Sequence, residues 1–517
     1  MAKKKRQSRK SGKRRKTAGR ARTASADVIA DSQRRPKYIV IFREISERNE
    51  NALQTCAKRA ASAKPRLAAV PGVKSIGAAR MHTTLGVAAT DLDDNELAQL
   101  QGRADVERIV PNQERFMQIV DESRGPEPGS IGSRGFGPGR VDPYGIIDGP
   151  VDPFGTPGGP VDPFGTVGGP VDPFGRVGGP VDPFAVGGES FLPYIRGYRD
   201  GLVGLVDRFE RTVAPAIAAM RLMEDTDALT YGLRMIGLNE GQPKLTGNGV
   251  RVAVLDTGID TDHPDFENRF EDEERLRSFV EGEDVQDVIG HGTHCAGTIG
   301  GPLNSSRRRR YGVAPECELY IGKVLSNNGS GWDSDILEGI SWAIGQKCRV
   351  ISMSLGSPRG RGEAYSEPYE RIAQRLMNRA DGTLVIAAAG NESMRHLGRI
   401  APVGNPAAGP SILSVAAVDN RERVAWFSCG QQDNIGLVNI AAPGVRTYSS
   451  VPGGFGFKSG TSMSTPHVAG IAALIFEKNP GFTPVEAWTQ LASSAKPLPL
   501  PNSDVGRGLA RVPDGTH

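Results

Sequence analysis

The sequence predicts an α/β protein: a parallel sheet with helices on both faces, preceded by a small α+β unit. From about residue 227 onward, short apolar strand candidates alternate with helix candidates such as SDILEGISWAIGQK (334–347). This alternation is typical of a parallel sheet, and strands that are apolar throughout are typical of a sheet covered on both faces. The strand candidates are GVRVAVLD, ELYIGKVL, VISMSL, TLVIAAAG and SILSVAAV. Ligands of such sheets bind at the carboxyl ends of the strands, so the residues that follow each strand are the candidates for function.

Residues 1–35 form a basic segment that we expect to be disordered. Residues 1–22 contain 12 Lys and Arg and no acid, although the whole chain of 517 residues has a net charge of only +4. The remaining residues therefore carry 51 basic and 59 acidic side chains. Because blocks of like charge repel each other and often contact polyanions, residues 1–22 are a candidate contact for nucleic acid or an anionic surface.

Residues 36–120 predict the small α+β unit. KYIVIFRE (37–44) alternates apolar and polar positions like a strand, and RNENALQTCAKRAAS (48–62) follows at helical spacing. LGVAATDL predicts a further strand, DDNELAQLQGRA a second helix with acids in its first turn, and VERIVPNQERF (106–116) a closing strand. This order fits a ferredoxin-like, split-βαβ fold.

Residues 121–189 predict a linker rich in Gly and Pro. Five decads in register from Val141 begin with VDPYG, VDPFG or VDPFA. One aromatic residue and one Val in ten residues cannot build a packed core, so a spacer is the favoured interpretation. The alternative is a repeated docking motif in which the aromatic residues are the contacts.

Residues 190–226 predict an amphipathic helix that Pro215 kinks. Apolar residues recur three or four positions apart, which places them on one stripe; they are Leu202, Val206, Phe209, Val213, Ile217 and Met220. Packing against the domain that follows is the favoured role. Self-association or the docking of a partner is the alternative.

The N-terminal residues predict a cytoplasmic protein, with secretion as the alternative. The segment after Arg22, TASADVIADSQRRPK, lacks the apolar region of a secretory signal. An odd number of Cys, five, fits reduced thiols and excludes a small disulfide scaffold. No apolar run reaches the roughly 18 residues of a transmembrane segment, so none is expected.

Three segments of the main part carry reactive side chains. LDTGIDTDHPDF contains Asp256, IGHGTHCAGTIGG contains His291, and SGTSMSTPHVAGIAALI contains Ser462. A Ser hydroxyl becomes a nucleophile when a base takes its proton, and His is the base that titrates near neutral pH. A buried Asp then orients the imidazole. Asp, His and Ser in this order therefore predict a hydrolytic triad.

These segments resemble the catalytic domain of subtilases, the subtilisin-like serine proteases of peptidase family S8, over residues 227–517. GVAPECELYIGKVLSNNGSG, ISMSLGS and AAAGNES are similar as well, and HGTHCAGT, with Cys295 near His291, is most similar to the proteinase K branch. The resemblance implies a serine endopeptidase that acts on polypeptide substrates. It implies that Asp256 orients the base, that His291 is the base and that Ser462 is the nucleophile.

The resemblance also implies an oxyanion hole and a substrate cleft. Asn391 and the backbone N–H of Ser462 are the expected oxyanion donors. An extended substrate peptide is expected to pair as a strand between two glycine-containing edges, because glycine lets the backbones approach closely. One edge is Ser354, Leu355 and Gly356, and the other is Gly329, Ser330 and Gly331. Glu392, beside Asn391, is expected to line the first substrate pocket, which receives the side chain just before the cleaved bond. It is expected to make that pocket favour basic side chains or tolerate varied ones.

No cofactor is expected to be required. Subtilases often bind structural calcium, and Asp265 matches a position that contributes to one such site. The loop PLNSSRRRRYGVAP (302–315) carries four consecutive Arg, a poor setting for a cation. Calcium therefore stays possible without an assigned site.

KYIVIFRE and VERIVPNQERFM resemble the inhibitor-type propeptide of subtilases. The resemblance implies that residues 36–120 are an intramolecular inhibitor whose last strand lies in the active site, and that self-cleavage falls around Met117–Ser123. The favoured function is a serine endopeptidase made as an autoinhibited, self-processing precursor. The alternative is a regulatory or scaffold protein with an inactive protease domain, which binds nucleic acid or anionic surfaces through its basic segment.

Overall fold

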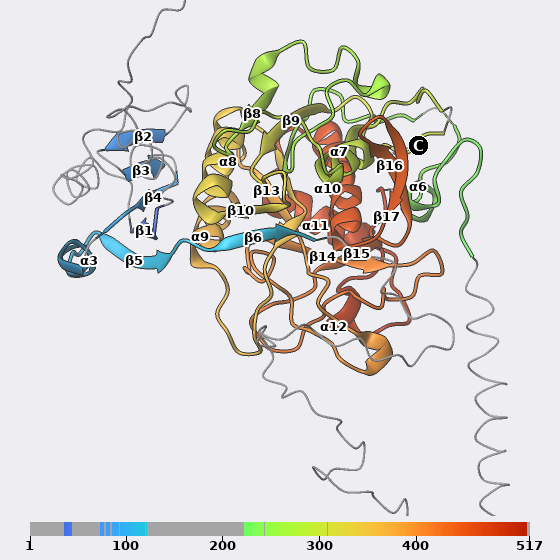
Figure 1. Ribbon diagram of the computed structural model, residues 1–517. Coiled ribbons are helices and arrows are strands. Elements are labelled where there is room, and N and C mark those ends of the chain that lie inside the picture. Colours follow the sequence, from blue (N-terminus) through green and yellow to red (C-terminus); the bar gives the residue numbers. More distant parts are fainter. Residues whose placement is uncertain are drawn as a thin grey trace, which may run out of the picture. The chain divides into compact units, whose positions relative to one another are not determined.

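The computed structural model of the chain describes residues 36–43, 73–76, 79–82, 85–92, 94–118, 120, 222–241, 243–307 and 309–513 (Figure 1). The basic segment, the helix predicted over 48–62, the decad repeat and residues 190–221 lie outside these ranges. The chain divides into two compact units, residues 1–112 and 113–517, and each is described by itself below.

The first unit contains a five-stranded antiparallel sheet with the order β2-β3-β4-β1-β5. Its elements are β1 (Tyr38–Phe42), β2 (Val73–Ile76), β3 (Ala79–His82), β4 (Val87–Thr90), α3 (Asp94–Gln101) and β5 (Val106–Pro111). Val40 and Phe42 of β1 pack with Leu100 of α3 in a buried cluster. The order β3-β4-β1-β5 is the one expected of a split-βαβ unit, and β2 is an additional edge strand.

The strand predicted over 106–116 is two strands that belong to different units. β5 pairs with β1, and the Asn112 N–H donates to the Lys37 carbonyl oxygen at 2.9 Å. β6 (Glu114–Met117) lies in the second unit, between β10 (Ser330–Trp332) and β12 (Leu355–Gly356). Pro111, Asn112 and Gln113 interrupt the strand pattern at this point, and each half then pairs with different strands.

The second unit is built on the predicted parallel sheet, which has seven strands in the order β15-β14-β13-β11-β7-β9-β8. The strands are β7 (Arg251–Asp256), β8 (Leu276–Ser278), β9 (Glu318–Lys323), β11 (Val350–Met353), β13 (Leu384–Ala388), β14 (Leu413–Val418) and β15 (Ile440–Pro443). All six neighbouring pairs are parallel. β11, β13 and β14 are buried along their whole length. The predicted α/β fold class is therefore confirmed.

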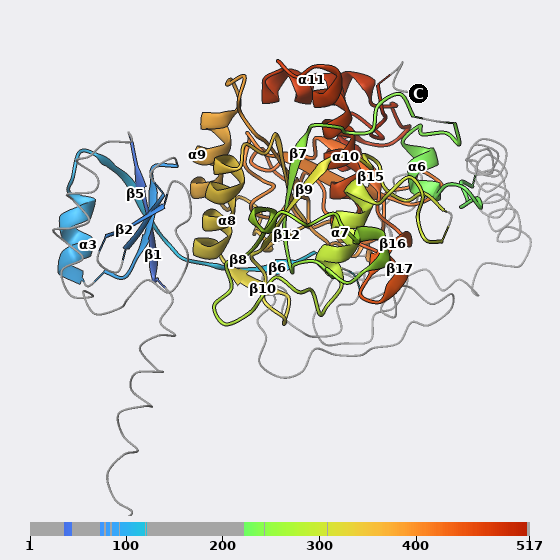
Figure 2. The same ribbon diagram turned by 90° about the horizontal axis from the view of Figure 1, so that it is seen from above.

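Helices cover both faces of this sheet (Figures 1 and 2). Helices α7 (His291–Gly300), α10 (Thr461–Lys478) and α11 (Pro484–Ser494) lie on one face, and α8 (Asp333–Gly345) and α9 (Glu367–Leu376) lie on the other. The shorter elements are α6 (Tyr231–Met235), α12 (Asn502–Val505), the 3-10 turns Pro264–Phe266, Glu273–Arg275 and Arg395–Leu397, and the hairpin of β16 (Thr447–Val451) and β17 (Gly454–Lys458).

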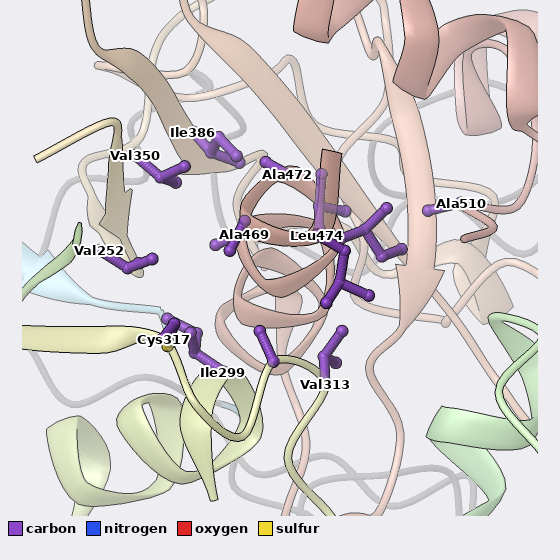
Figure 3. Packing of buried hydrophobic residues seen from close by; sticks show 14 of the residues in the cluster. Val252, Ile299, Val313, Cys317, Val350, Ile386, Ala469, Ala472, Leu474 and Ala510 are labelled. Atoms are coloured by element: carbon purple, nitrogen blue, oxygen red, sulfur yellow. The ribbon is translucent and has the colours of Figure 1, made fainter. Parts of the chain in front are cut away.

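The core lies between α10 and the sheet (Figure 3). Ala469 and Ala472 of α10 point toward Val350 and Ile386 of the strands, and all four side chains are buried. Small residues let the helix approach the sheet closely, so the start of α10 is held firmly against the strand ends. This packing fixes the position of Ser462, the second residue of the helix.

Candidate active site

Asp256 and His291 meet at the carboxyl edge of the parallel sheet. Asp256 is the last residue of β7, and His291 is the first residue of α7. Asp256 Oδ1 lies 2.7 Å from His291 Nδ1, and both side chains are fully buried. Because a carboxylate only accepts, Nδ1 carries the shared proton, which leaves Nε2 as the ring nitrogen that can accept one. Within the described ranges, Nε2 is buried and has no hydrogen-bond partner.

Asp287 holds the start of α7, although the sequence analysis did not single it out. Its Oδ1 accepts from the Gly290 N–H at 2.8 Å, and its Oδ2 accepts from the N–H and the hydroxyl of Thr293 at 2.9 and 2.7 Å. Its Oδ1 also accepts from the Thr257 hydroxyl, which joins the helix to the residue after Asp256. The N-cap position of α7 is Gly290, three residues after Asp287, so the usual capping signal did not point to this role.

Ser462 and Ser354 exchange hydrogen bonds next to this pair. Ser462 Oγ donates to the Ser354 carbonyl oxygen at 3.0 Å, and Ser354 Oγ donates to the Ser462 carbonyl oxygen at 2.9 Å. Cys295 Sγ lies 3.5 Å from the same Ser462 oxygen, and it is within 4.8 Å of the side-chain ligand atoms of Asp256 and His291. The three residues predicted as a triad therefore border one buried site.

Asn391 follows β13 and points its amide nitrogen into the site. Its Oδ1 accepts from the N–H of Thr461 at 2.9 Å and from the Thr461 hydroxyl at 3.0 Å. This assignment leaves Nδ2 as the free end of the amide, and it is buried without a partner among the described residues. An unpartnered donor beside the N-terminus of α10 is suited to stabilise developing negative charge.

β6 lies between the two predicted cleft edges as an antiparallel strand. Phe116 is in register with Ser330 and with Gly356, so it pairs with both sides. The Met117 N–H donates to the Gly329 carbonyl oxygen at 3.0 Å, and the Gln118 N–H donates to the Ser354 carbonyl oxygen at 3.2 Å. The structure thus brings an extended segment of this chain to residues 329–331 and 354–356.

Glu392 lies beside the end of this strand. Cys429 Sγ is 3.0 Å from Glu392 Oε2, and the Gln118 side chain also hydrogen-bonds the carboxyl group. Burial raises the pKa of Glu392, and the hydrogen bonds from Cys429 and Gln118 offset only part of that shift. The predicted first-pocket residue therefore contacts the side chain of Gln118.

The remaining histidines of the three segments are buried and structural. His294 Nε2 contacts the Thr447 carbonyl oxygen, and His467 Nδ1 contacts the Met463 carbonyl oxygen, each at 2.8 Å. Burial lowers the pKa of His294 to about 3 and that of His467 to about 4. Both rings are therefore neutral near pH 7 and bind the backbone.

Asp265, the residue weighed as a calcium ligand, uses both oxygens within the protein. Oδ1 accepts from the Ser306 N–H and Oδ2 accepts from the Tyr311 hydroxyl, each at 2.8 Å. These two hydrogen bonds tie Asp265 to Ser306 and Tyr311. This geometry gives no reason to assign a calcium site at Asp265.

A parallel α/β sheet that carries a buried Asp–His pair and a serine at the start of the central helix defines a serine protease of the subtilisin class. The chain belongs to the subtilase family, whose model matches residues 247–508. It is 43% identical over 271 residues to subtilisin E of Bacillus subtilis (strain 168), a match that covers 52% of this chain and 65% of the relative.

Two further relatives are covered almost completely. The chain is 42% identical over 270 residues to the subtilisin of Bacillus pumilus, which covers 52% of this chain and 90% of the relative. It is 42% identical over 275 residues to subtilisin Savinase of Lederbergia lenta, which covers 53% of this chain and 93% of the relative. The likeness to the proteinase K branch stays a prediction.

The predicted cytoplasmic location is wrong. The subtilisins that match this chain are secreted, extracellular enzymes. The prediction depended on the lack of an apolar region after Arg22, a segment that lies outside the matched residues 247–508. In the described ranges, no helix combines the length and the apolar character needed to cross a membrane.

Proposed function

We propose that the chain hydrolyses peptide bonds within polypeptides through an acyl-enzyme formed on Ser462. The observation that carries this proposal is the buried 2.7 Å hydrogen bond between Asp256 and His291. It keeps the proton on Nδ1, so the basic nitrogen of the ring is Nε2, on the side away from the carboxylate. A hydroxyl that turns from the Ser354 carbonyl oxygen toward Nε2 can lose its proton there.

The reaction then runs in two halves. Ser462 Oγ bonds to the substrate carbonyl carbon as its proton passes to His291 Nε2, and Asp256 stabilises the imidazolium that forms. Asn391 Nδ2 and the Ser462 N–H donate to the oxyanion. His291 returns the proton to the leaving amine, and the C–N bond breaks. Water then hydrolyses the acyl ester while His291 again takes and returns the proton, which frees Ser462.

The chain acts as its own first substrate, and the bond cleaved is the one after Gln118. Support comes from the Ser354 carbonyl oxygen, which accepts both the Gln118 N–H and the Ser462 hydroxyl. The carbonyl group of Gln118 is therefore close to the nucleophile. After cleavage, residues up to Gln118 stay as a product-like inhibitor until they dissociate or are degraded.

The experiment compares the full chain with its Ser462→Ala variant. The wild-type protein should hydrolyse casein and yield a fragment whose N-terminal sequence begins IVDES, at residue 119. The variant should stay uncut and inactive. Casein hydrolysis by the purified variant would overturn the assignment, and an uncut, inactive wild-type chain would favour a scaffold protein instead.

Residues 1–22 bind polyanions before processing. Their 12 basic side chains and lack of acids support this role, because phosphate contacts release counterions. The uncut Ser462→Ala chain should be retained on immobilised DNA in a salt-dependent way, and the same chain starting at Thr23 should not. Equal retention of the two proteins would overturn this role.

A further inference from the structure

Arg115 of β6 is buried in a closed polar pocket of the second unit. Its side chain is 1% exposed, and its Nε and Nη2 atoms bind Oδ1 and Oδ2 of Asp333 at 2.7 and 3.0 Å. Phe116, the next residue, is 46% exposed. The alternation of a strand explains the contrast, because successive side chains point to opposite faces.

The pocket is built for a guanidinium group. Asp333 is the first residue of α8, where the helix dipole favours a negative charge, and the Tyr369 hydroxyl donates to its Oδ1 at 2.7 Å. Arg115 Nη1 donates to the Ser357 hydroxyl oxygen, and Nη2, which also binds Asp333, donates to the Ser366 hydroxyl oxygen at 3.4 Å. The Tyr369 ring lies 5.7 Å from the guanidinium carbon, at the distance of a cation–π contact.

We propose that the pocket formed by Asp333, Tyr369 and Ser357 recognises an arginine side chain of protein substrates, at the fourth residue before the cleaved bond. This inference rests on the proposed function, in which Gln118 is the first residue before the cleaved bond and Arg115 is the fourth. A substrate strand pairs through its backbone with residues 329–331 and 354–356, as β6 does. Its fourth side chain therefore enters the space that Arg115 fills.

The selectivity comes from Asp333. An apolar side chain in the pocket removes water from the carboxylate without replacing the lost hydrogen bonds, and a neutral polar one replaces them without a compensating charge, which is costly for a charged group. Arginine restores two parallel hydrogen bonds, whereas lysine supplies a point charge without the planar fork. Arginine should therefore be favoured over lysine, and both over neutral residues.

The test uses four peptides that keep the native residues next to the bond, acetyl-X-Phe-Met-Gln with a coumarin leaving group. X is arginine, lysine, leucine or citrulline, which has the shape of arginine without its charge. For the processed wild-type enzyme, kcat/KM should be about 10- to 100-fold higher with arginine than with citrulline, as expected for a charged hydrogen-bonded pair. This comparison requires no variant.

Asp333→Asn should lower kcat/KM for the arginine peptide toward that for the citrulline peptide, so that the ratio of the two values falls close to one. Asp381→Asn is the matched control, because this exposed acid pairs with Arg379 on the surface. It should leave the preference intact. Equal cleavage of all four peptides by the wild-type enzyme would overturn the inference and leave the proposed function standing. Failure to cleave any peptide would overturn both.

Discussion

Ser354 and Ser462, 108 residues apart in the sequence, donate a hydrogen bond to each other's carbonyl oxygen. The Ser462 carbonyl is available because Pro466, four residues further along α10, has no N–H to bond with it. The hydroxyl of Ser354 takes the place of that missing donor. The Ser354 carbonyl oxygen in turn accepts hydrogen bonds from the Ser462 hydroxyl and from the Gln118 N–H. The cleft edge and the nucleophile are thus one hydrogen-bonded unit.

Ser354→Ala should lower the free energy of unfolding by about 1–3 kcal/mol, because it leaves the buried Ser462 carbonyl without its hydroxyl donor. The matched control is Ser352→Ala, since the Ser352 hydroxyl is buried and has no partner in the described part of the chain. That change should be neutral. Denaturant unfolding in a His291→Ala background, which prevents self-digestion, measures both. Equal losses for the two variants would contradict this explanation.

Asn391→Ala should lower kcat by about 10²–10³ with little change in KM, a magnitude known from subtilisin itself for the loss of one oxyanion donor. The amide contributes mainly when charge develops on the substrate oxygen, so ground-state binding is spared. Steady-state kinetics on a peptide substrate measure the two constants. A large rise in KM with kcat unchanged would assign Asn391 to substrate binding instead.

His467 should make the fold sensitive to acid. Burial lowers the pKa of its ring to about 4 in the folded chain, while the unfolded chain binds the proton below about pH 6.5. Between these values the unfolded state holds more protons, so stability falls as the pH drops, by up to about 1.4 kcal/mol per pH unit. His467→Gln in the Ser462→Ala chain should flatten this slope, and the same change at the exposed His396 should not. Parallel slopes for the two variants would refute the role of His467.

Asp287→Asn should lower both the melting temperature and kcat, because the carboxylate holds the first turn of α7, where His291 lies. Thr483 caps α11, the helix after α10, by accepting from the Glu486 N–H, and in the described part of the chain none of its hydrogen bonds reaches a site residue. Thr483→Ala should therefore lower the melting temperature and leave kcat unchanged. Thermal melting and steady-state kinetics on the same samples separate the two effects. An unchanged kcat for Asp287→Asn would show that the cap does not position His291.

The sequence predicted the parallel sheet well, because its strands leave local patterns, and the predicted triad residues leave local patterns too. Continuous apolar runs mark the doubly covered strands, and Asp256, His291 and Ser462 each lie in a distinctive segment. The division between β5 and β6 was missed, although Pro111, Asn112 and Gln113 interrupt the apolar pattern there.

Contacts between distant residues that lie outside the family motifs could not be predicted. Arg115 and Asp333 are 218 residues apart, and neither stands out from the many charged residues of the chain. Their pairing depends on the register of β6 against β10 and β12, which is set by backbone pairing in three dimensions. The same is true of the exchange between Ser354 and Ser462.

The identity of the nucleophile is tested most directly by mapping the residue that a fluorophosphonate probe labels. The account predicts one adduct on the active chain, located by mass spectrometry on Ser462, and no adduct on the His291→Ala or Ser462→Ala chains. A probe adduct on any other residue, or labelling that persists in the Ser462→Ala chain, would contradict it.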